Sequence, residues 1–326
     1  MNTENSICVS VIIPVYNEER YIERCMDSLL AQSYPRGKME WIVIDGNSTD
    51  RTREILSRYE KQGPLRLLIN EKRTAPVSLN MGIREAKGRY IIRFDAHAAF
   101  PPDYIENCVR CLETVEADNV GGYVETEAEG FIGAAIAKLL SSRFGVGGSA
   151  FRVSKNAGYV DTVPFGAFRR EVFDRVGLFR EDLPRSEDND INARIIESGG
   201  KVYLSDRIHS VYYCRDSVGA LLRQALQNGN ALFHTIRQNP KAMRLRHFVP
   251  FCFLLSLIVL PLLGLVFSPA RWLLCFELIV YLAADLAFSF FCASPEKGIV
   301  TVWLFPLYHL SYGLGSLLGL FGIRLF

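Results

Sequence analysis

The amino-acid sequence predicts an α/β fold with a Rossmann-like, mainly parallel sheet, followed by C-terminal transmembrane helices. Through the first hundred residues, apolar and β-branched runs of strand length alternate with segments whose apolar residues recur at helical spacing. This alternation is typical of doubly wound parallel sheets. Later in the chain, residues 249–267 contain no charged side chain, and this run is long enough to cross a bilayer core of about 30 Å.

The first predicted strand is the apolar run at residues 8–16, which ends at a polar cluster. The helix after it is predicted from the helical spacing of Ile22, Cys25, Met26 and Leu29. The same alternation predicts strands at residues 41–45, 65–70 and 90–95, with helices at about residues 50–59 and 75–86 between them. Together these units predict the parallel sheet.

The charge balance argues against one class of function. Thirty-seven Lys and Arg residues are balanced by thirty-five Asp and Glu residues, so we expect no nucleic-acid partner bound by bulk charge. Nearly half of the residues are apolar, which excludes intrinsic disorder. The eight cysteines follow no disulfide framework, and Cys108 and Cys111 lack a second metal-binding pair, so we interpret them as buried thiols.

The composition divides the chain into three predicted parts. Residues 1–215 form the α/β domain, residues 216–247 an amphipathic interfacial helix region, and residues 248–326 a membrane domain with about three transmembrane helices. In the middle part, Leu221, Leu222 and Leu226 are interleaved with Arg223 and Gln224, which is typical of helices that lie along a membrane surface. The second and third apolar stretches are residues 272–292 and 299–323.

The predicted topology is that of a multi-pass cell-membrane protein with its α/β domain in the cytosol. The polar N-terminus lacks a signal peptide. Four basic residues precede the first span and one follows it, namely Arg237, Lys241, Arg244 and Arg246 against Arg271. The third stretch contains Pro306, Gly313 and Gly315, so a re-entrant segment is the alternative to a third crossing. Glu277 and Asp285 of the second stretch are expected to face neighbouring helices.

Polar side chains follow each of the four predicted strands. The strands end in Tyr16-Asn17-Glu18, in Asp45-Gly46-Asn47, in Asn70-Glu71-Lys72-Arg73 and in Asp95-Ala96-His97. Ligands of doubly wound sheets bind outside the carboxyl ends of the strands. We therefore expect these residues to form one site.

The chemistry of this edge suggests a nucleoside diphosphate bound through a divalent metal ion. The first strand is followed by neither a GxGxxG motif nor a P-loop. The acidic edge would repel a diphosphate unless a cation intervened or Lys72 and Arg73 reached it. Asp95 and His97 stand two residues apart, so a strand or a turn can aim both at one ion.

These residues also have ordinary structural explanations. Asp95 would serve as a turn or helix-cap residue before Pro101, and His97 as a packed or solvated histidine. Asp45 would be a turn former ahead of an N-cap such as Asp50. Each signal is weak by itself, and the combination of motifs is more specific.

Five motifs occur in order: PVYNEE, DGNSTD, NMGIREAKGRYIIRFDAHA, FRREVFDRVGLF and SEDNDINARIIESGG. With them, roughly residues 6–215 resemble the family 2 glycosyltransferases, which have the GT-A nucleotide-sugar-binding fold. Within that family, the DAHA wording and the apolar C-terminus are most similar to the succinoglycan-biosynthesis type of glucosyltransferase, which has a C-terminal membrane region.

The resemblance implies roles for the residues of the edge. Pro14, Tyr16 and Glu18 would line the uridine pocket, and Asp45 would contact the nucleotide base. Asp95 would be the metal ligand of the DxD motif, in which His97 here replaces the second acid. The expected cofactor is a divalent metal, Mn²⁺ or Mg²⁺, and an imidazole ligand favours Mn²⁺.

Glu187 and Asp188 begin a predicted helix in SEDNDINARI. They could simply complement the helix dipole, with Ser186 or Asn189 as the cap. The resemblance implies instead that this pair supplies the catalytic base, namely Asp188, while Glu187 orients it or touches the acceptor.

The implied activity is inverting transfer of a hexose, expected to be glucose, from a UDP-sugar to a hydroxyl of a polyprenyl-diphosphate-linked saccharide in surface or exopolysaccharide biosynthesis. The other expected partners are membrane lipid and further polysaccharide-assembly proteins. The Arg-Trp of a QxxRW motif is absent after Gln224, which favours addition of single sugars. The alternatives are a polyprenyl-phosphate glycosyltransferase and a non-catalytic membrane scaffold that retains the fold.

Overall fold

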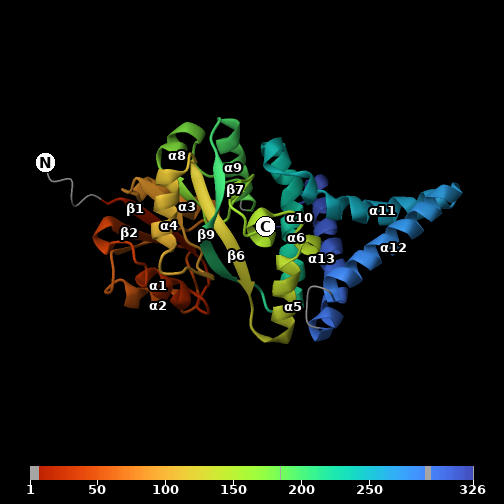
Figure 1. Ribbon diagram of the computed structural model, residues 1–326, viewed down its shortest axis with the longest axis horizontal. Helices are drawn as coiled ribbons and strands as arrows, with labels where there is room; N and C mark the ends of the chain where they lie inside the picture. The colour runs from red at the N-terminus through yellow and green to blue at the C-terminus, as the bar shows by residue number, and fades with distance from the viewer. Residues whose placement is uncertain (1–6, 184, 291–294, 326) are drawn as a thin grey trace. The chain divides into compact units, whose positions relative to one another are not determined.

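The computed structural model describes residues 7–183, 185–290 and 295–325. By its internal packing the chain divides into two compact units (Figure 1). The first, here called the sheet unit, comprises Met1–Glu125 and Ser154–Tyr213. The second, here called the helical unit, comprises Thr126–Val153 and Cys214–Phe326. The boundaries predicted at residues 215 and 247 remain a prediction.

The sheet unit is built on a mixed sheet, which has nine strands among the described residues, in the order β3-β2-β1-β4-β8-β6-β9-β5 with β7 beside β9. Four strands run parallel: β1 (Val9–Val15), β2 (Met39–Asp45), β3 (Leu65–Ile69) and β4 (Tyr90–Arg93). Antiparallel pairs join β8 (Ala167–Arg169) to β4 and to β6 (Asn119–Glu127). They also join β9 (Val202–Tyr213) to β5 (Ala98–Ala99) and β7 (Gly158–Tyr159).

The apolar runs that predict the first two strands form the centre of the sheet. Every residue of β2 is buried, and so is every residue of β1 except Pro14, which is half-buried. Parallel strands of this kind are covered on both faces. One covering helix, α3 (Ala75–Glu85), packs so closely that a Cβ on Gly82 would lie 2.5 Å from Ile12 Cγ2.

The predicted α/β fold is confirmed, and the four predicted strands and three predicted helices are all present. The first helix, α1 (Ile22–Leu30), buries the same four residues whose spacing predicts it. The remaining helices of the sheet unit are α2 (Thr52–Tyr59), α4 (Tyr104–Thr114), α8 (Glu171–Val176) and α9 (Glu187–Glu197). The antiparallel half of the sheet is not anticipated, because three of its strands are only two or three residues long.

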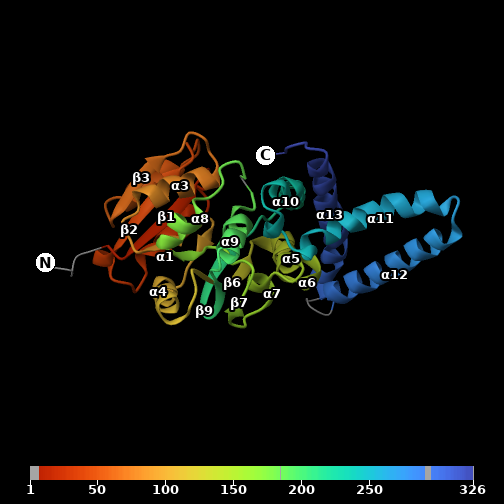
Figure 2. The same cartoon turned by 90° about the horizontal axis from the view of Figure 1, so that it is seen from above.

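The helical unit contains two groups of helices. The first group lies between β6 and the return to the sheet unit: α5 (Gly130–Ser141), α6 (Arg143–Val146) and α7 (Ala150–Val153). The second group follows β9: α10 (Val218–Gln238), α11 (Val249–Gly264), α12 (Ser268–Phe290) and α13 (Pro295–Leu320), with 3₁₀ turns at Pro240–Ala242 and Leu245–His247 (Figure 2).

One helix of the described part of the chain, α12, is long and apolar enough to cross a membrane. α11 is apolar but has only 16 residues. α13 is a continuous helix of 26 residues with Pro306 inside it, and it is not apolar enough. The prediction of about three crossings and a multi-pass location is therefore not supported. The second predicted span ends at Cys292, which lies outside the described residues.

Candidate active site

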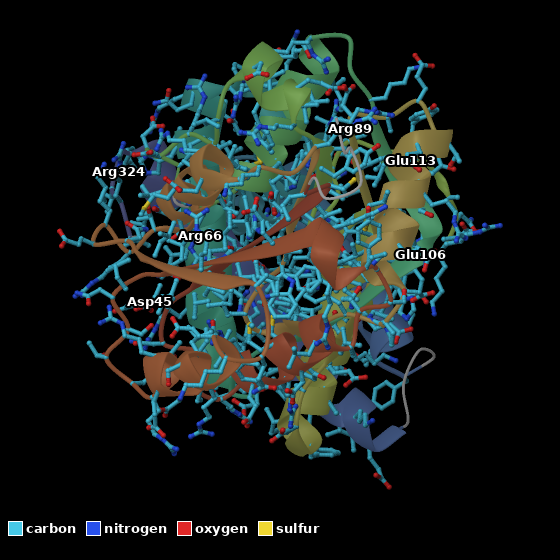
Figure 3. All side chains as sticks on the ribbon, turned by 90° about the vertical axis from the view of Figure 1, so that its left-hand side faces the viewer. Asp45, Arg66, Arg89, Glu106, Glu113 and Arg324 are labelled. Carbon is cyan, nitrogen blue, oxygen red and sulfur yellow. The ribbon has the colours of Figure 1, made fainter. Side chains whose placement is uncertain are left out.

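The loops after the parallel strands meet at one edge of the sheet, as parallel strands require. Three residues in these loops have left-handed backbones although they are not glycine: Asn17 (φ 51°) after β1, Asn47 (φ 60°) after β2 and Arg73 (φ 61°) after β3. Such conformations are uncommon, and they concentrate at functional sites. Figure 3 looks onto the sheet unit and labels Asp45 at this edge.

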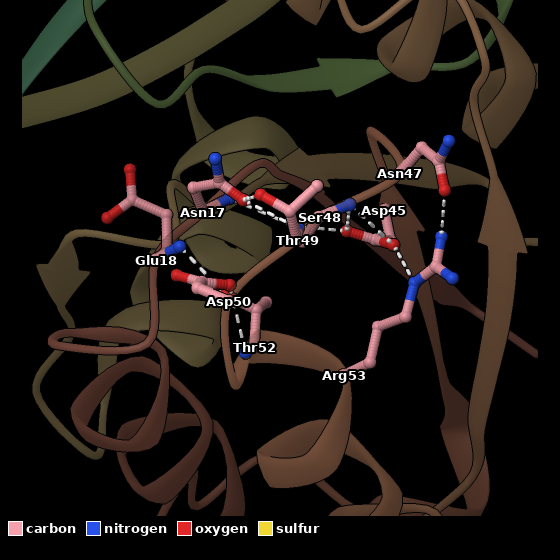
Figure 4. A network of polar contacts seen from close by, with 9 residues as sticks. All are labelled: Asn17, Glu18, Asp45, Asn47, Ser48, Thr49, Asp50, Thr52 and Arg53. Carbon is pink, nitrogen blue, oxygen red and sulfur yellow. Dashed lines mark hydrogen bonds and ion pairs between the residues drawn. The ribbon is translucent and has the colours of Figure 1, made fainter.

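Asp45 holds its own loop together (Figure 4). Its buried carboxylate accepts hydrogen bonds from the Ser48 backbone N–H at 3.1 Å and from the Ser48 hydroxyl at 2.5 Å, and it pairs with the Arg53 guanidinium. Arg53 also donates to Asn47 Oδ1 at 2.8 Å. These are the contacts of a turn-forming aspartate, and a contact between Asp45 and a nucleotide base remains a proposal.

The loop after β1 is fastened to the loop after β2 by hydrogen bonds that Figure 4 also shows. The Asn17 backbone N–H donates to the Ser48 hydroxyl at 2.9 Å, and the Thr49 N–H donates back to Asn17 Oδ1 at 2.9 Å. The Glu18 N–H donates to Thr52 Oγ1 at 2.8 Å. Asn17, the motif DGNSTD and Thr52 therefore fix the position of Glu18 at the edge.

Arg93, the last residue of β4, joins the carboxylates that were predicted to belong to two separate parts of the site. Its side chain is only 9% exposed. It contacts Asp95 Oδ1 at 3.1 Å, Glu187 Oε1 at 3.1 Å and Asp188 Oδ1 at 2.7 Å. Arg93 is not among the predicted site residues, although it stands two positions before Asp95 at the end of β4. One guanidinium therefore serves three carboxylates.

The pKa of Asp188 is raised in these surroundings. Burial, together with the charges of Glu187 and Asp95, raises the pKa of Asp188 to about 7, although Arg93 opposes the rise. Burial alone would lower the pKa of Arg93, but the three carboxylates raise it well above its usual value. Arg93 thus stays charged, and Asp188 can exchange a proton near neutral pH.

The start of α9 presents Glu187 and Asp188 to Arg93. Ser186 precedes the helix in a left-handed conformation (φ 65°), and its side chain makes no capping hydrogen bond. Asp190, one turn into the helix, is instead committed to the structure, because it pairs with Arg194 at 2.9 Å and with Arg180 at 3.5 Å. The acids at the helix start are therefore of two kinds, and only Glu187 and Asp188 contact Arg93.

His97 and Glu18 meet across the edge. His97 Nδ1 lies 3.1 Å from Glu18 Oε1, and the His97 ring packs edge-on against Tyr212 with 5.2 Å between ring centroids. A carboxylate at one ring nitrogen is the arrangement that orients a metal-ligating histidine. The contact between Glu18 and His97 therefore joins the loop after β1 to the segment that follows β4.

The predicted metal site can be tested by its donor set. Within residues 7–183, 185–290 and 295–325, no group of three or more His, Cys, Asp or Glu side chains is arranged to hold an ion. In nucleotide sites, however, the phosphates of the substrate commonly complete a metal's coordination with one or two protein ligands. Arg93 occupies only part of the acceptor capacity of Asp95, and a metal ion held by Asp95 and His97 remains a proposal.

The remaining predicted donor-binding residues, apart from Pro14, are exposed at the same edge. Tyr16 is 42% exposed, and the Arg73 guanidinium stands over its ring, 5.9 Å from the centroid. Lys72 pairs with Glu181 at 3.3 Å rather than with the acids of the edge. Pro14 is half-buried within β1. The structure therefore does not join Lys72 to the group around Arg93.

Comparison with known proteins identifies the family of the chain. The model of the family described as Glycosyl transferase family 2 matches residues 10–177. A dolichyl N-acetyl-α-D-glucosaminyl phosphate 3-β-D-2,3-diacetamido-2,3-dideoxy-β-D-glucuronosyltransferase of Methanococcus voltae is 31% identical over 266 residues, covering 79% of this chain and 82% of the relative. The succinoglycan biosynthesis protein ExoA of Rhizobium meliloti is 27% identical over 312 residues, covering 94% and 92%.

Solved structures show the same fold. A mannosyltransferase from Pyrobaculum calidifontis, in complex with GDP-Man and Mn²⁺, aligns with a TM-score of 0.63 at 22% identity, covering 96% of this chain and 87% of that one. TarS residues 1–349 of S. aureus, in complex with UDP-GlcNAc, aligns with a TM-score of 0.53 at 15% identity, covering 98% and 93%. With the family match over residues 10–177, the predicted GT-A fold is confirmed, and the chain belongs to glycosyl transferase family 2.

Proposed function

We propose that this glycosyltransferase moves a hexose, most simply glucose, from a UDP-sugar to a hydroxyl of a polyprenyl-diphosphate-linked saccharide, with inversion, at the cytosolic face of the cell membrane. The observation that carries the proposal is Arg93, which holds the Asp95 carboxylate and the Glu187–Asp188 pair within reach of one guanidinium. The names of two relatives support the acceptor class: one acts on a dolichyl-linked sugar phosphate, and the other serves succinoglycan biosynthesis.

Asp188 is the proposed general base. Its Oδ1 is bound by Arg93 Nη1 at 2.7 Å, and its side chain is 27% exposed, so an acceptor hydroxyl can approach the carboxylate. Asp188 takes the hydroxyl proton while the acceptor oxygen bonds to the anomeric carbon of the donor sugar. On the opposite face the bond from that carbon to the diphosphate oxygen breaks, and the nucleoside diphosphate leaves with the bonding electrons. One displacement inverts the anomeric centre without a covalent enzyme intermediate.

Donor binding is assigned to the loops after β1, β2 and β3. Tyr16 with Arg73 offers an exposed aromatic and cationic surface for a base, and Pro14, Glu18 and Asp45 complete the proposed nucleotide pocket. Lys72 and Arg73 are the cations of this edge for the diphosphate. A divalent metal, Mn²⁺ or Mg²⁺ held by Asp95 and His97, would supply positive charge against the leaving diphosphate.

The test uses the full chain in detergent, offered UDP-glucose, other UDP-hexoses and GDP-mannose, with Mn²⁺ or Mg²⁺. The acceptor is either a polyprenyl-diphosphate oligosaccharide or a polyprenyl phosphate. We expect nucleoside diphosphate release and a product heavier by one hexose with the saccharide acceptor only, with the new anomeric bond opposite in configuration to that of the donor. Transfer to polyprenyl phosphate would instead identify a lipid-phosphate glycosyltransferase, and no turnover with any donor would indicate a scaffold.

A further inference from the structure

The helices α11 and α12 form an apolar hairpin that belongs wholly to the helical unit (Figure 2). Three consecutive residues of α12, Leu278, Ile279 and Val280, are 44%, 67% and 50% exposed. Because successive helical residues differ by about 100° in direction, α12 is apolar around most of its circumference. A helix of this kind is covered by lipid or by a protein core.

The turn between the two helices is also apolar. Leu265, Val266 and Phe267 are 82%, 88% and 59% exposed. A water-exposed turn that joins two helices is normally polar. A contiguous exposed apolar patch marks an interaction surface. Arg271 packs its stem on Gly264, where a Cβ would lie 2.6 Å from Arg271 Cγ. The stem of Arg271 therefore lies against the end of α11.

The two acidic side chains of the hairpin have hydrogen-bond partners within it. The Ser256 hydroxyl of α11 lies 2.6 Å from Glu277 Oε1 of α12 and donates to it, and the Ser289 hydroxyl donates to Asp285 Oδ1 at 3.1 Å. Hydrogen bonds between or within helices are the means by which polar side chains are accommodated in a bilayer. The carboxyl groups of Glu277 and Asp285 are thus compatible with insertion of the hairpin.

α13 is held against α10 by contacts between their backbones. A Cβ on Gly229 of α10 would lie 1.9 Å from the Tyr312 carbonyl oxygen, and a Cβ on Gly315 would lie 1.9 Å from the Leu226 carbonyl oxygen. α10 also carries Arg223 and Gln227, which would be costly in hydrocarbon. A helix packed this closely on α10 lies on the same side of the membrane as α10.

The end of the chain is tied to α10 as well. Asn230 Nδ2 donates to the Ile323 carbonyl at 2.9 Å, and the Leu325 N–H donates to Asn230 Oδ1 at 3.1 Å. Arg237 donates to the Gly319 carbonyl at 3.1 Å and the Leu320 carbonyl at 2.6 Å. These bonds fix residues 319–325 beside a helix that follows directly from the sheet unit.

We propose that the α11–α12 hairpin is the membrane-inserted element of this chain, that it enters an anionic bilayer from the cytosolic side, and that α13 does not cross. The cationic segment before α11, which contains Arg237, Lys241, Arg244 and Arg246, then lies at the base of the hairpin and attracts anionic headgroups. Both ends of the hairpin, and the C-terminus with them, remain on the side of α10. The inference rests on the proposed membrane location and not on the proposed sugar chemistry.

The first test uses Trp272, which is 76% exposed one turn from the hairpin's tip. In a Trp303→Phe variant, Trp272 is measured against a background from Trp41, which is fully buried. With the full chain on phosphatidylcholine vesicles containing phosphatidylglycerol, we expect acyl-chain-brominated lipids to quench Trp272. The double variant Trp272→Phe, Trp303→Phe should lose the quenching. Unquenched Trp272 in vesicle-bound protein would overturn the insertion.

Flotation with the same vesicles provides a matched pair of variants. Val266→Asp should reduce the bound fraction strongly, whereas Tyr159→Asp, which charges an exposed aromatic (58%) of the sheet unit, should not. Equal losses would overturn the role of the tip, and loss of monomers on size exclusion without vesicles would identify a second copy of the chain as the occupant.

The crossing number is tested by a reporter fused after Phe326. Cytosolic signal is expected, and signal confined to the outer face would overturn the proposal. None of these results depends on turnover.

Discussion

Arg93 is the positively charged side chain that contacts the three carboxylates of the candidate site. Its guanidinium is surrounded by Asp95, Glu187 and Asp188, so the group carries two more negative charges than positive ones when all three acids are ionised. Burial raises the pKa of Asp188 to about 7, and the charges of Glu187 and Asp95 add to the rise. A base with a pKa near the working pH combines a useful deprotonated fraction with real proton affinity.

Replacing Asp188 with Asn should lower kcat by about two to four orders of magnitude, because the acceptor hydroxyl loses its proton acceptor. Donor affinity should survive, since the proposed donor contacts lie in the other loops. Single-turnover kinetics and a direct donor-binding titration check both quantities. Glu187→Gln, which keeps the base, should be the milder change. A donor affinity that collapses together with kcat would make Asp188 a binding or structural residue.

The same variant has a stability signature that separates catalysis from damage to the fold. Asp188 has a folded-state pKa of about 7 against an ordinary 3.8. Its contribution to stability is therefore fully present below pH 3.8 and is lost as the pH rises through 7. Asp188→Asn removes that loss. The Tm of the variant minus the Tm of the original protein should therefore increase between pH 4 and pH 8. A variant whose Tm at pH 8 lies below that of the original protein would show that the substitution damages the site.

The pH dependence of kcat/KM follows from the same carboxyl group. A protonated Asp188 cannot accept the hydroxyl proton, so the rate should fall about tenfold per pH unit below the pKa, which lies at about 7. Glu187→Gln removes one neighbouring negative charge and should move this limb to lower pH. Rates measured from pH 5 to pH 9 in the free-enzyme regime test both statements. A limb that stays in place in Glu187→Gln would argue against Asp188 as the titrating group.

Chelation should abolish transfer, and added Mn²⁺ should restore it, because the leaving diphosphate needs a cation. Asp95→Asn should lose Mn²⁺ binding measured by titration calorimetry in the presence of UDP, with Tm reported as a control, since Asp95 also contacts Arg93. His97→Asp should keep activity and shift its preference toward Mg²⁺. Full activity in excess EDTA would exclude the metal, and a His97→Ala variant that responds normally to every ion would exclude His97 as a ligand.

At the scale of single residues, the sequence identifies the acids of the site but not the residue that joins them. Asp95 and Asp188 stand at recognisable motifs, whereas Arg93 contacts Glu187 and Asp188 across 94 and 95 positions of chain. No local spacing encodes such a contact, because it depends on the antiparallel half of the sheet that brings α9 back to β4. The alternation of Arg93, Asp95 and His97 at one strand end is the signal that could have found it.

At the scale of elements, periodicity predicts what is locally encoded. The ends of β1, β2, β3 and β4 lie within two residues of the predicted ends, because each strand is an apolar run stopped by polar residues. The same reasoning does not predict β6 and β9. β6 contains adjacent glycines, and a Cβ on Gly122 would lie 1.7 Å from the Ile208 carbonyl oxygen of β9. That glycine is required by a neighbour distant in sequence, which a local pattern cannot show.

A matched glycine pair on α10 tests the close packing of the helical unit. Gly229→Ala would place a methyl group 1.9 Å from the Tyr312 carbonyl and should destabilise the unit by about 1–3 kcal/mol. Gly219, ten residues earlier on the same helix, has nothing within 4 Å of its Cβ position, and Gly219→Ala should stabilise by about 0.5–1 kcal/mol. Thermal unfolding of both variants in detergent is the measurement. Equal Tm values would mean that α13 is not packed on α10 in this way.

At the scale of the whole molecule, each unit is built from two separate segments of the chain. The chain leaves the sheet unit at Thr126, returns at Ser154 and leaves again after Tyr213. The sequence places no boundary before residue 215, since no composition change marks residues 126–153. Within the helical unit, α5 buries Ile136, Leu139 and Leu140, and the Phe144 carbonyl of α6 lies 3.0 Å from His309 Nε2 of α13. Residues 126–153 therefore depend on helices that follow residue 215.

Two shortened chains distinguish these divisions. A chain that ends at residue 215 keeps α5 and α6 without α13, so its exposed apolar surface should cause aggregation and dye binding. A second chain that also ends at Tyr213, but replaces residues 126–153 with a short Gly/Ser linker, should be monomeric and should bind UDP. The linker can be short, because Lys155 Nζ lies 3.3 Å from Glu125 Oε1 across the junction. If the first chain is monomeric and binds UDP as well as the second, residues 126–153 belong to the sheet unit and the boundary predicted at residue 215 is the real one.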